Sequence, residues 1–264
     1  MSEAATSGSG MSGSGRGSCV IAGLGPGDPS LITPQVKAAL DAATDVVGYI
    51  PYVRRIAPRP GLRLHESDNR VELDRARHAL EMAEEGRHVV VVSSGDPGVF
   101  AMAAAIFEAV EAHPPWAALE ITVLPGITAM LAAAAAAGAP LGHDFCAINL
   151  SDNLKPWALI EERLTLALRA DFAIALYNPR SKARPDGFGR CLDLLRAQVE
   201  PERLILFARA VSTPDQDLRT LPLAECTPEM ADMRTIVSIG ARATRAIPRP
   251  DRAPFLYTPR SVPE

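Results

Sequence analysis

The sequence predicts an α/β protein with two lobes of similar size. Short β-branched runs such as Val89–Val92 are each followed by a glycine- and proline-rich turn and then by an Ala- or Leu-rich helical pattern. After Gly138 the texture of the chain changes, and a second series of strand and helix patterns begins. Strands that alternate with helices usually pair in parallel, so we expect the first half to hold a mostly parallel sheet covered by helices.

Start and stop signals place the elements in chain order. Ser30 or Thr33 suits the N-cap of the first helix, whose first turn tolerates Pro34, and Gly86 suits the C′ position of the second. The expected strands cover residues 19–24, 44–50, 88–94, 118–126, 145–152, 171–178, 203–211 and 233–240. The expected helices run through 36–43, 73–85, 99–110, the Ala-rich stretch from Thr128, 157–170 and 189–199.

Four parts follow one another along the chain. Residues 1–17 form a Ser/Gly-rich tail that we expect to be disordered, since it lacks the apolar core of a signal peptide. Residues 18–122 form the N-terminal α/β lobe and residues 123–247 the C-terminal α/β lobe. Residues 248–264 are a Pro/Arg-rich tail that we expect on the surface.

Composition excludes several classes of protein. Hydrophobic residues make up 47% and charged residues 22% of the chain, as in ordinary globular proteins. The net charge of −4 argues against a basic nucleic-acid surface, and no apolar run reaches the roughly 18 residues of a membrane span. The four scattered cysteines form no CxxC motif, which predicts reduced thiols in a cytoplasmic protein and no metal site.

Five strands end in loops of Gly, Pro, Asp, Ser and Thr. They are GLGPGDP (Gly23–Pro29), SSGDP (Ser93–Pro97), LPGITA (Leu124–Ala129), NLSD (Asn149–Asp152) and LYNPRSKAR (Leu176–Arg184). Ligands of open α/β sheets bind outside the carboxyl ends of the strands. Five such loops in register with strand ends therefore predict one composite binding cleft.

The main rival interpretation is a dinucleotide-binding fold. GLGPGD resembles the G-x-G-x-x-G fingerprint, and Asp45 lies about 20 residues further on, where a ribose-binding acid is expected. However, Gly27 comes too early for the third glycine, and Asp28 places negative charge where a pyrophosphate would lie. P-loop, HExxH and GxSxG motifs are also absent from the sequence.

The loops combine small residues, backbone amides and the carboxylates of Asp28 and Asp96. Such chemistry repels phosphates and suits a ligand with ribose hydroxyls, an adenine and a cationic end. S-adenosylmethionine has all three, although another adenosine or aminoacyl ligand would fit as well. The purely structural alternative for each Gly-Asp-Pro sequence is a turn whose Asp caps the next helix.

The motifs in these loops resemble those of the tetrapyrrole (corrin/porphyrin) methylases. GLGPGDPSLIT matches the first-strand loop of that family, and a GDP turn and a PGITA loop follow in order. The similarity extends from about Cys19 to Arg245. It implies two α/β lobes of the tetrapyrrole methylase type with S-adenosylmethionine in the cleft between them, in a homodimer.

Further segments are similar to the subgroup of this family that methylates carbon 17 of precorrin-3B during cobalamin synthesis. They are VGYIPYV, SSGDPGVFAMA, GAPLGHDFCAINLSD with a nearby KPW, and LYNPRSKARP. The resemblance implies methylation of the ring with contraction of the macrocycle to precorrin-4. It also implies a small-molecule tetrapyrrole partner, with no nucleic acid and no membrane.

Cofactor contacts follow from the matched motifs. The resemblance implies that Pro26 shapes the first loop and that Gly95, Asp96 and Val99 hold the methionine end. It implies further cofactor contacts from two residues of the PG loop, from an Asn at the end of a later strand and from a Val at a position that is usually Gly in the family. These are Thr128, Ala129, Asn178 and Val211.

Substrate chemistry suggests two more groups of residues. Precorrins carry acetate and propionate arms, so the RSKAR cations Arg180, Lys182 and Arg184 are candidates to bind them. A base that takes a proton from the substrate would assist the transfer. Three residues compete for that role: Asp152, His143 and Asp68. The structural alternative is a helix cap for Asp152 and a satisfied, partly buried side chain for His143.

Three alternatives stay open. A neighbouring member of the family would act on a cobalt-containing C17 intermediate, or methylate carbon 11 of a precorrin. The same fold serves an rRNA ribose methylase, but the acidic balance of the chain and its Arg-rich loop argue against that substrate. The third alternative is a non-catalytic nucleoside-binding or scaffolding protein.

Overall fold

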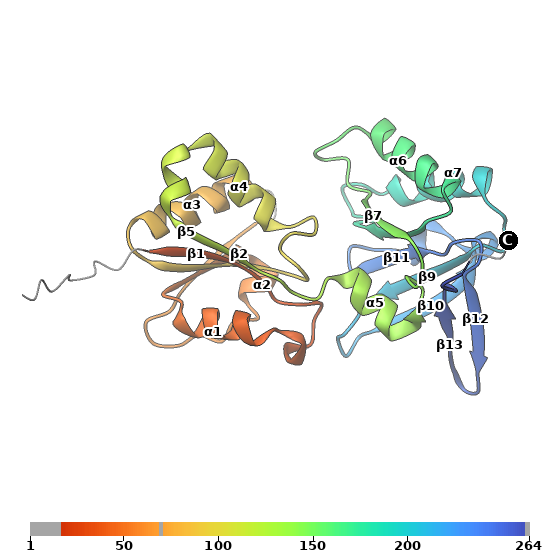
Figure 1. Ribbon diagram of the computed structural model, residues 1–264, viewed down its shortest axis with the longest axis horizontal. Coiled ribbons are helices and arrows are strands. Elements are labelled where there is room, and N and C mark those ends of the chain that lie inside the picture. The colour runs from red at the N-terminus through yellow and green to blue at the C-terminus, as the bar shows by residue number, and fades with distance from the viewer. Residues whose placement is uncertain (1–16, 69–70, 262–264) are drawn as a thin grey trace, which may run out of the picture. The chain divides into compact units, whose positions relative to one another are not determined.

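The computed structural model describes residues 17–68 and 71–261 (Figure 1). Most of the expected N-terminal tail therefore lies outside the described residues. The chain divides into two compact units, which confirms the predicted two-lobed α/β fold. The first unit holds the chain up to Gly23 and Thr33–Pro125, and the second holds Leu24–Ile32 and Gly126–Glu264. The first glycine-rich loop thus belongs to the second unit, which the sequence did not indicate.

The first unit is built on a five-stranded sheet with the order β3-β2-β4-β1-β5. All of its pairings are parallel, as predicted. Its strands are β1 (Ser18–Gly23), β2 (Asp45–Tyr49), β3 (Arg63–Ser67), β4 (His88–Ser93) and β5 (Glu120–Leu124). Strand β3 was not predicted, because it is a largely exposed edge strand of mixed polar sequence and carries no apolar run.

The connections of this sheet create a switch point between β1 and β4. From β1 the chain crosses β4 to reach β2, and from β4 it crosses β1 to reach β5. Figure 1 shows α1 (Pro34–Ala42) on one face, and α3 (Glu72–Glu84) and α4 (Met102–Ala112) on the other. Gly23 pairs with Ser93, so the carboxyl ends of the two strands meet where ligands of such sheets bind.

Capping and burial explain the remaining elements of this unit. Thr33, not Ser30, caps α1, since its hydroxyl accepts a hydrogen bond from the Val36 amide at 3.3 Å. Ile21, Leu80 and Ile106 are fully buried in the core, and each contributes about 1.5–3 kcal/mol by burial. The short helical segments are α2 (Ile50–Val53), η1 (Pro29–Leu31, in the second unit) and η2 (Pro114–Ala118).

The second unit contains a mixed five-stranded sheet with the order β10-β9-β11-β8-β7. Its strands are β7 (Phe145–Asn149), β8 (Ala173–Tyr177), β9 (Leu204–Arg209), β10 (Asp217–Pro222) and β11 (Thr235–Ile239). β7 and β8 are parallel, whereas β11 lies antiparallel between β8 and β9. The carboxyl ends of β7, β8 and β9 therefore meet at one edge of this sheet.

Helices cover both faces of the second sheet (Figure 1). α6 (Trp157–Arg169) and α7 (Gly187–Gln198) cover one face, over a core that includes Leu164, Leu176 and Phe188. α5 (Ala129–Ala137) packs on the other face, where Ala133 contacts Ala208 and Ile236. Two short 3₁₀ helices, η3 (Leu223–Glu225) and η4 (Pro228–Met230), precede β11.

The predicted Pro/Arg-rich tail needs correction. β12 (Arg245–Arg249) and β13 (Arg252–Tyr257) form a hairpin, and β13 also pairs with β6 (Gly138–Ala139). Leu256 is buried against Ala137 and Leu206. Residues 248–257 are thus part of the second unit. The prolines and arginines of this segment hid the strand pattern.

Two further features concern the chain as a whole. No helix among the described residues combines the length and apolarity that a membrane crossing requires. The four cysteines are free thiols, and burial raises the pKa of Cys19 and Cys191 to about 12. Such thiols are neutral and unreactive at physiological pH.

Candidate ligand-binding site

In the first unit, the candidate residues lie in the loop that follows β4. Gly95 is buried and has a φ of 63°, a conformation that few residues other than Gly adopt. The Asp96 carboxylate accepts a hydrogen bond from the Gly98 amide at 2.8 Å, and Val99 is half-buried. α4 begins only at Met102, so residues 99–101, which were expected to start the helix, belong to an irregular loop.

In the second unit, the glycine-rich loop packs directly on the loop after β9. A Cβ atom on Gly27 would lie 2.5 Å from Cγ2 of Thr213 and 2.8 Å from the backbone oxygen of Ser212. Only Gly fits this contact. Asp28 caps η1 and accepts a hydrogen bond from the Ser30 amide at 2.8 Å, which lowers the pKa of its carboxyl group. The capping alternative is therefore correct for Asp28, and the group is ionised at neutral pH.

The PG loop is fixed to the end of β8. Thr128 is buried and occupies the N-cap of α5, yet its hydroxyl lies 2.5 Å from the Tyr177 hydroxyl and does not cap the helix. The same Tyr177 oxygen accepts a hydrogen bond from the Met130 amide at 3.1 Å. Ala129, half-buried, lies between these two anchored residues. Tyr177 thus sets the position of the loop relative to Asn178.

Unusual backbone conformations cluster at the carboxyl ends of β8 and β9. Asn178, Ala210 and Ser212 have φ values of 52°, 48° and 61°. Val211, between the last two, has a buried side chain. Such conformations cost of order 1–3 kcal/mol each and concentrate at ligand sites, where the surrounding structure holds them in place.

Asn178 is held by a short chain of hydrogen bonds. Its side-chain amide donates to Oδ1 of Asn149 at 3.1 Å, and the same oxygen accepts from the Ser151 amide at 2.9 Å. The loops after β7 and β8 are therefore joined through Asn149.

The RSKAR segment forms a tight turn next to Asn178. The backbone groups of Ser181 and Arg184 bond to each other, and the Arg184 guanidinium donates to the Asn178 carbonyl at 3.4 Å. Nε of Arg180 donates to the Pro185 carbonyl at 3.2 Å, and Lys182 is exposed. Three cations are thereby brought to the edge where β7, β8 and β9 end.

No single base emerges from the three candidates. Asp152 is exposed and is not the cap of α6, whose N-cap is Pro156. His143 is half-buried, and its Nδ1 accepts a hydrogen bond from the Asp144 amide at 2.7 Å. Asp68 is exposed, and its carbonyl accepts a hydrogen bond from Arg75. Residues 69 and 70, which follow Asp68, lie outside the described residues.

The structure excludes Asp45 as a ribose-binding acid. Asp45 is the first residue of β2, so it lies at the amino edge of a parallel sheet, opposite the edge where ligands bind. Its buried carboxylate accepts hydrogen bonds from Thr44 and His65, both at 2.8 Å, with Arg63 and Arg87 nearby. Burial alone would raise its pKa, but these partners outweigh burial and lower it.

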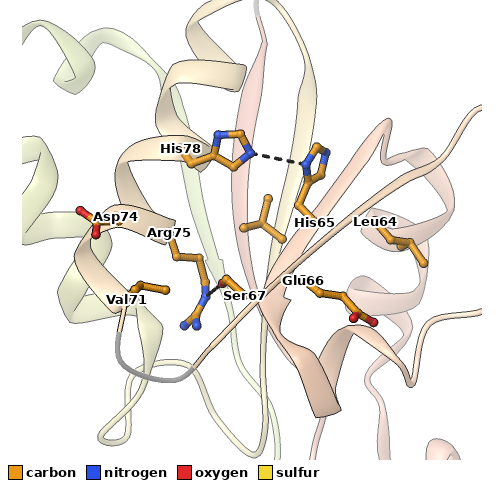
Figure 2. Close-up of a pocket in the computed structure, with 9 residues that line it drawn as sticks. Leu64, His65, Glu66, Ser67, Val71, Asp74, Arg75 and His78 are labelled. Atoms are coloured by element: carbon orange, nitrogen blue, oxygen red, sulfur yellow. Dashed lines mark hydrogen bonds between the residues drawn. The ribbon is translucent and has the colours of Figure 1, made fainter.

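A cavity of about 480 Å³ lies beside β3 and α3 of the first unit. Figure 2 shows His65 and His78 pointing toward each other across it, and Arg75 reaching Ser67. Nδ1 of His65 lies 3.4 Å from Nε2 of His78, and Nε of Arg75 donates to the Ser67 hydroxyl at 2.7 Å. Most of the polar side chains that line this cavity are therefore hydrogen-bonded to one another.

Sequence reasoning missed several residues that shape the site. Tyr177 and Asn149 were included in loops but not singled out, and Lys155 was noted only within KPW. Tyr177 is the last residue of β8, so its position directly before Asn178 was the available signal. Among the described residues, no group of three or more His, Cys, Asp or Glu side chains is arranged to hold a metal ion.

Comparison with known proteins gives consistent results. The family model of the tetrapyrrole (corrin/porphyrin) methylases matches residues 18–227. A Sinorhizobium protein named precorrin-3B C(17)-methyltransferase is 49% identical over 245 residues, which cover 92% of this chain and 96% of that protein. The cobalamin biosynthesis protein CobIJ of Mycobacterium bovis is 44% identical over 254 residues, and the match covers only 49% of its length.

A solved structure has the same fold. The crystal structure described as the methyltransferase CobJ is 68% identical in sequence and superposes with a TM-score of 0.88. The match covers 92% of this chain and 100% of that one.

Proposed function

The chain belongs to the tetrapyrrole (corrin/porphyrin) methylases, and on that premise we propose that it methylates carbon 17 of precorrin-3B with S-adenosylmethionine as methyl donor. The product is precorrin-4, formed with contraction of the ring during cobalamin synthesis. One observation carries the proposal: the chain matches almost the whole length of a relative named for this reaction.

The loops at the strand ends fit the methyl donor. The loops GLGPGDP, SSGDP and LPGITA offer small residues, backbone amides and the Asp96 carboxylate, and these three loops contain no lysine and no arginine. We assign Pro26, Thr128, Ala129, Asn178 and Val211 to the donor site in the second unit. Gly95, Asp96 and Val99 are the corresponding residues of the first unit. Carboxylates suit the cationic sulfonium and ammonium groups, whereas phosphates would be repelled.

The protein contributes mainly positioning. When bound, S-adenosylmethionine supplies an electrophilic methyl group on a sulfonium centre. The Gly27 contact and the Thr128–Tyr177 bond hold the loops in fixed positions before any ligand binds. Orientation of this kind contributes on the order of 7–11 kcal/mol to lowering a barrier. Asp152, His143 and Asp68 remain the candidates for a base that takes a proton from the substrate.

The remaining assignments concern the substrate and the assembly. Arg180, Lys182 and Arg184 bind carboxylate arms of the macrocycle, for which the charge of the turn is suited. The enzyme acts as a homodimer in the cytoplasm, on a free small-molecule substrate, without nucleic acid or membrane.

Incubation with precorrin-3B and methyl-labelled donor tests the function. Mass spectrometry should show one labelled methyl group in the corrinoid product, and NMR should place it on carbon 17. Parallel incubation with cobalt-factor III separates the metal-free from the cobalt-containing substrate. Label on another carbon, such as carbon 11, or exclusive use of the cobalt compound would replace the proposed reaction. Absence of transfer to any tetrapyrrole would favour a nucleoside-binding protein.

A further inference from the structure

The loop between β7 and α6 brings a lysine to the edge of the candidate site. Lys155 is half-buried, and its ammonium group donates to the Ser151 carbonyl at 3.3 Å. The Ser151 amide in turn donates to Asn149. Lys155 is therefore held next to the hydrogen-bonded chain that positions Asn178.

Arg184 is tied to the same frame from the other side. Its guanidinium donates to the Asn178 carbonyl, while the Asn178 side chain donates to Asn149. Lys155 and Arg184 thus lie on two loops that share Asn149 as their link. These hydrogen bonds tie both cations to the same frame.

These cations lie close enough to act on one another. Burial is the main cause that lowers the pKa of Lys155, and the nearby charges of Arg163 and Arg184 lower it further, against a smaller opposite effect of Asp152. Among the described residues, neither Lys155, Arg163 nor Arg184 forms an ion pair within 4.0 Å. Clustered like charges are unfavourable in the free protein, and an anion would relieve them.

Apolar side chains lie beside the cations. Leu154, directly before Lys155, is 91% exposed. Met233 is 48% exposed, and its sulfur lies 3.9 Å from Nη2 of Arg184. A ligand with an apolar face and a carboxylate rim matches this combination.

We propose that Lys155 and Arg184 form a carboxylate-binding pair that selects polycarboxylated tetrapyrroles, with Leu154 against the face of the macrocycle. This inference rests on the proposed function and adds Lys155 and Leu154 to the substrate site. Lys155 is a specificity residue and takes no part in methyl transfer.

The pair makes binding depend on pH in one direction. A bound carboxylate favours the charged form of Lys155, so the complex takes up a proton where the free lysine has lost it. Affinity is then full below the lowered pKa of Lys155 and falls as pH rises through it. Arg163, Arg184 and Asp152 are the charged groups that face Lys155.

Uroporphyrin, an eight-carboxylate tetrapyrrole, is the probe for the first test. Its fluorescence is titrated with wild type, Lys155→Gln, Lys155→Arg and Lys37→Gln. Lys37 is an exposed lysine on α1 and serves as the matched control. Lys155→Gln should raise the Kd about five-fold, as expected for a partly exposed ion pair. Lys155→Arg should retain affinity and shift its alkaline loss to higher pH, and Lys37→Gln should behave as wild type.

A second variant tests the apolar contact. Leu154→Ser should weaken uroporphyrin binding while leaving the pH dependence of binding unchanged. Because Leu154 is exposed, we expect this variant to fold as wild type does. In the methyl-transfer assay, Lys155→Gln should raise KM for the tetrapyrrole with kcat retained.

The outcomes separate the two proposals. Equal Kd values for wild type and Lys155→Gln, or no uroporphyrin binding by wild type, would overturn the inference even if precorrin-3B is methylated. Lys155-dependent uroporphyrin binding by a protein that does not methylate precorrin-3B would overturn the proposed function and leave the carboxylate pair standing.

Discussion

Two charged clusters, one in each unit, are built in opposite ways. In the first unit, buried Asp45 is surrounded by donors from Thr44, His65, Arg63 and Arg87 at the amino edge of the sheet. In the second unit, Lys155 lies among other cations at the edge where β7, β8 and β9 end. We call Asp45 with these four residues the Asp45 cluster, and we call Lys155, Arg163 and Arg184 the Lys155 cluster.

The difference shows how charge is divided between stability and binding. The charges of the Asp45 cluster are satisfied within the protein, so they stabilise the fold and leave nothing for a ligand. The Lys155 cluster has an excess of one sign next to the candidate site, so it costs stability and favours an anion. Charged side chains at the amino edge of the first sheet thus stabilise the fold, whereas those at the carboxyl ends of β7, β8 and β9 favour binding of an anion.

The largest expected effect comes from breaking the Asp45 cluster. Asp45→Ala removes the partner of several cations and should lower the free energy of unfolding by about 3 kcal/mol. Urea denaturation measures the change. Asp74→Ala breaks an exposed ion pair with Arg77 and is the matched control, with an expected loss of about 0.5 kcal/mol. Equal losses in the two variants would contradict the special role of Asp45.

A pH titration of stability sharpens the comparison. Because the pKa of Asp45 is lower in the folded protein, its contribution is present above the unfolded pKa of about 3.9 and is lost as pH falls through the folded value. Stability of wild type should therefore fall more steeply in acid than that of Asp45→Asn. Thermal unfolding of both proteins between about pH 2 and pH 5 measures this slope, because the contribution is lost below the unfolded pKa. Parallel curves would show that Asp45 has no shifted pKa.

A smaller effect is expected from the anchor of the PG loop. Tyr177→Phe removes the hydroxyl that bonds Thr128 and Met130, and should cost about 1–2 kcal/mol of stability. We also expect weaker binding of S-adenosylhomocysteine in calorimetry, because the loop loses its position. Tyr257→Phe on β13 is the control. Unchanged affinity in Tyr177→Phe would separate this loop from the donor site.

The smallest effect on stability should come from the Lys155 cluster. Lys155→Gln removes one of several like charges. It should therefore leave the free energy of unfolding unchanged or raise it by up to about 0.5 kcal/mol. Urea denaturation beside Asp45→Ala makes the contrast direct. A loss comparable to that of Asp45→Ala would mean that Lys155 has a structural role.

Much of the fold could be predicted because its signals are local. The apolar run of β4 and the Gly-Asp-Pro turn after it are visible in a few residues, and so are the helix caps. Strand direction is not local. Nothing in the pattern of β11 shows that it lies antiparallel between β8 and β9. β3 was missed because an edge strand needs no apolar alternation.

The candidate site shows the same division. The sequence showed a glycine-rich first loop, but the contact between Gly27 and Thr213 could not be predicted, because it depends on residues far apart in the chain. The sequence also singled out the cations of RSKAR. That Lys155 lies near Arg184 was not predicted. The two cations belong to different loops, which are joined through the hydrogen bonds of Asn149.

The central claim is that the strand-end loops hold the methyl donor, and calorimetry with S-adenosylhomocysteine tests it most directly. Wild type, Gly27→Ala and Gly189→Ala are compared, since a Cβ on Gly189 meets its nearest neighbour at 3.5 Å and is tolerated. Wild type and Gly189→Ala should bind with equal affinity, and Gly27→Ala should bind at least about tenfold more weakly because the added methyl group forces the loop away from Thr213. No heat with wild type, or equal affinity in Gly27→Ala, would contradict the account.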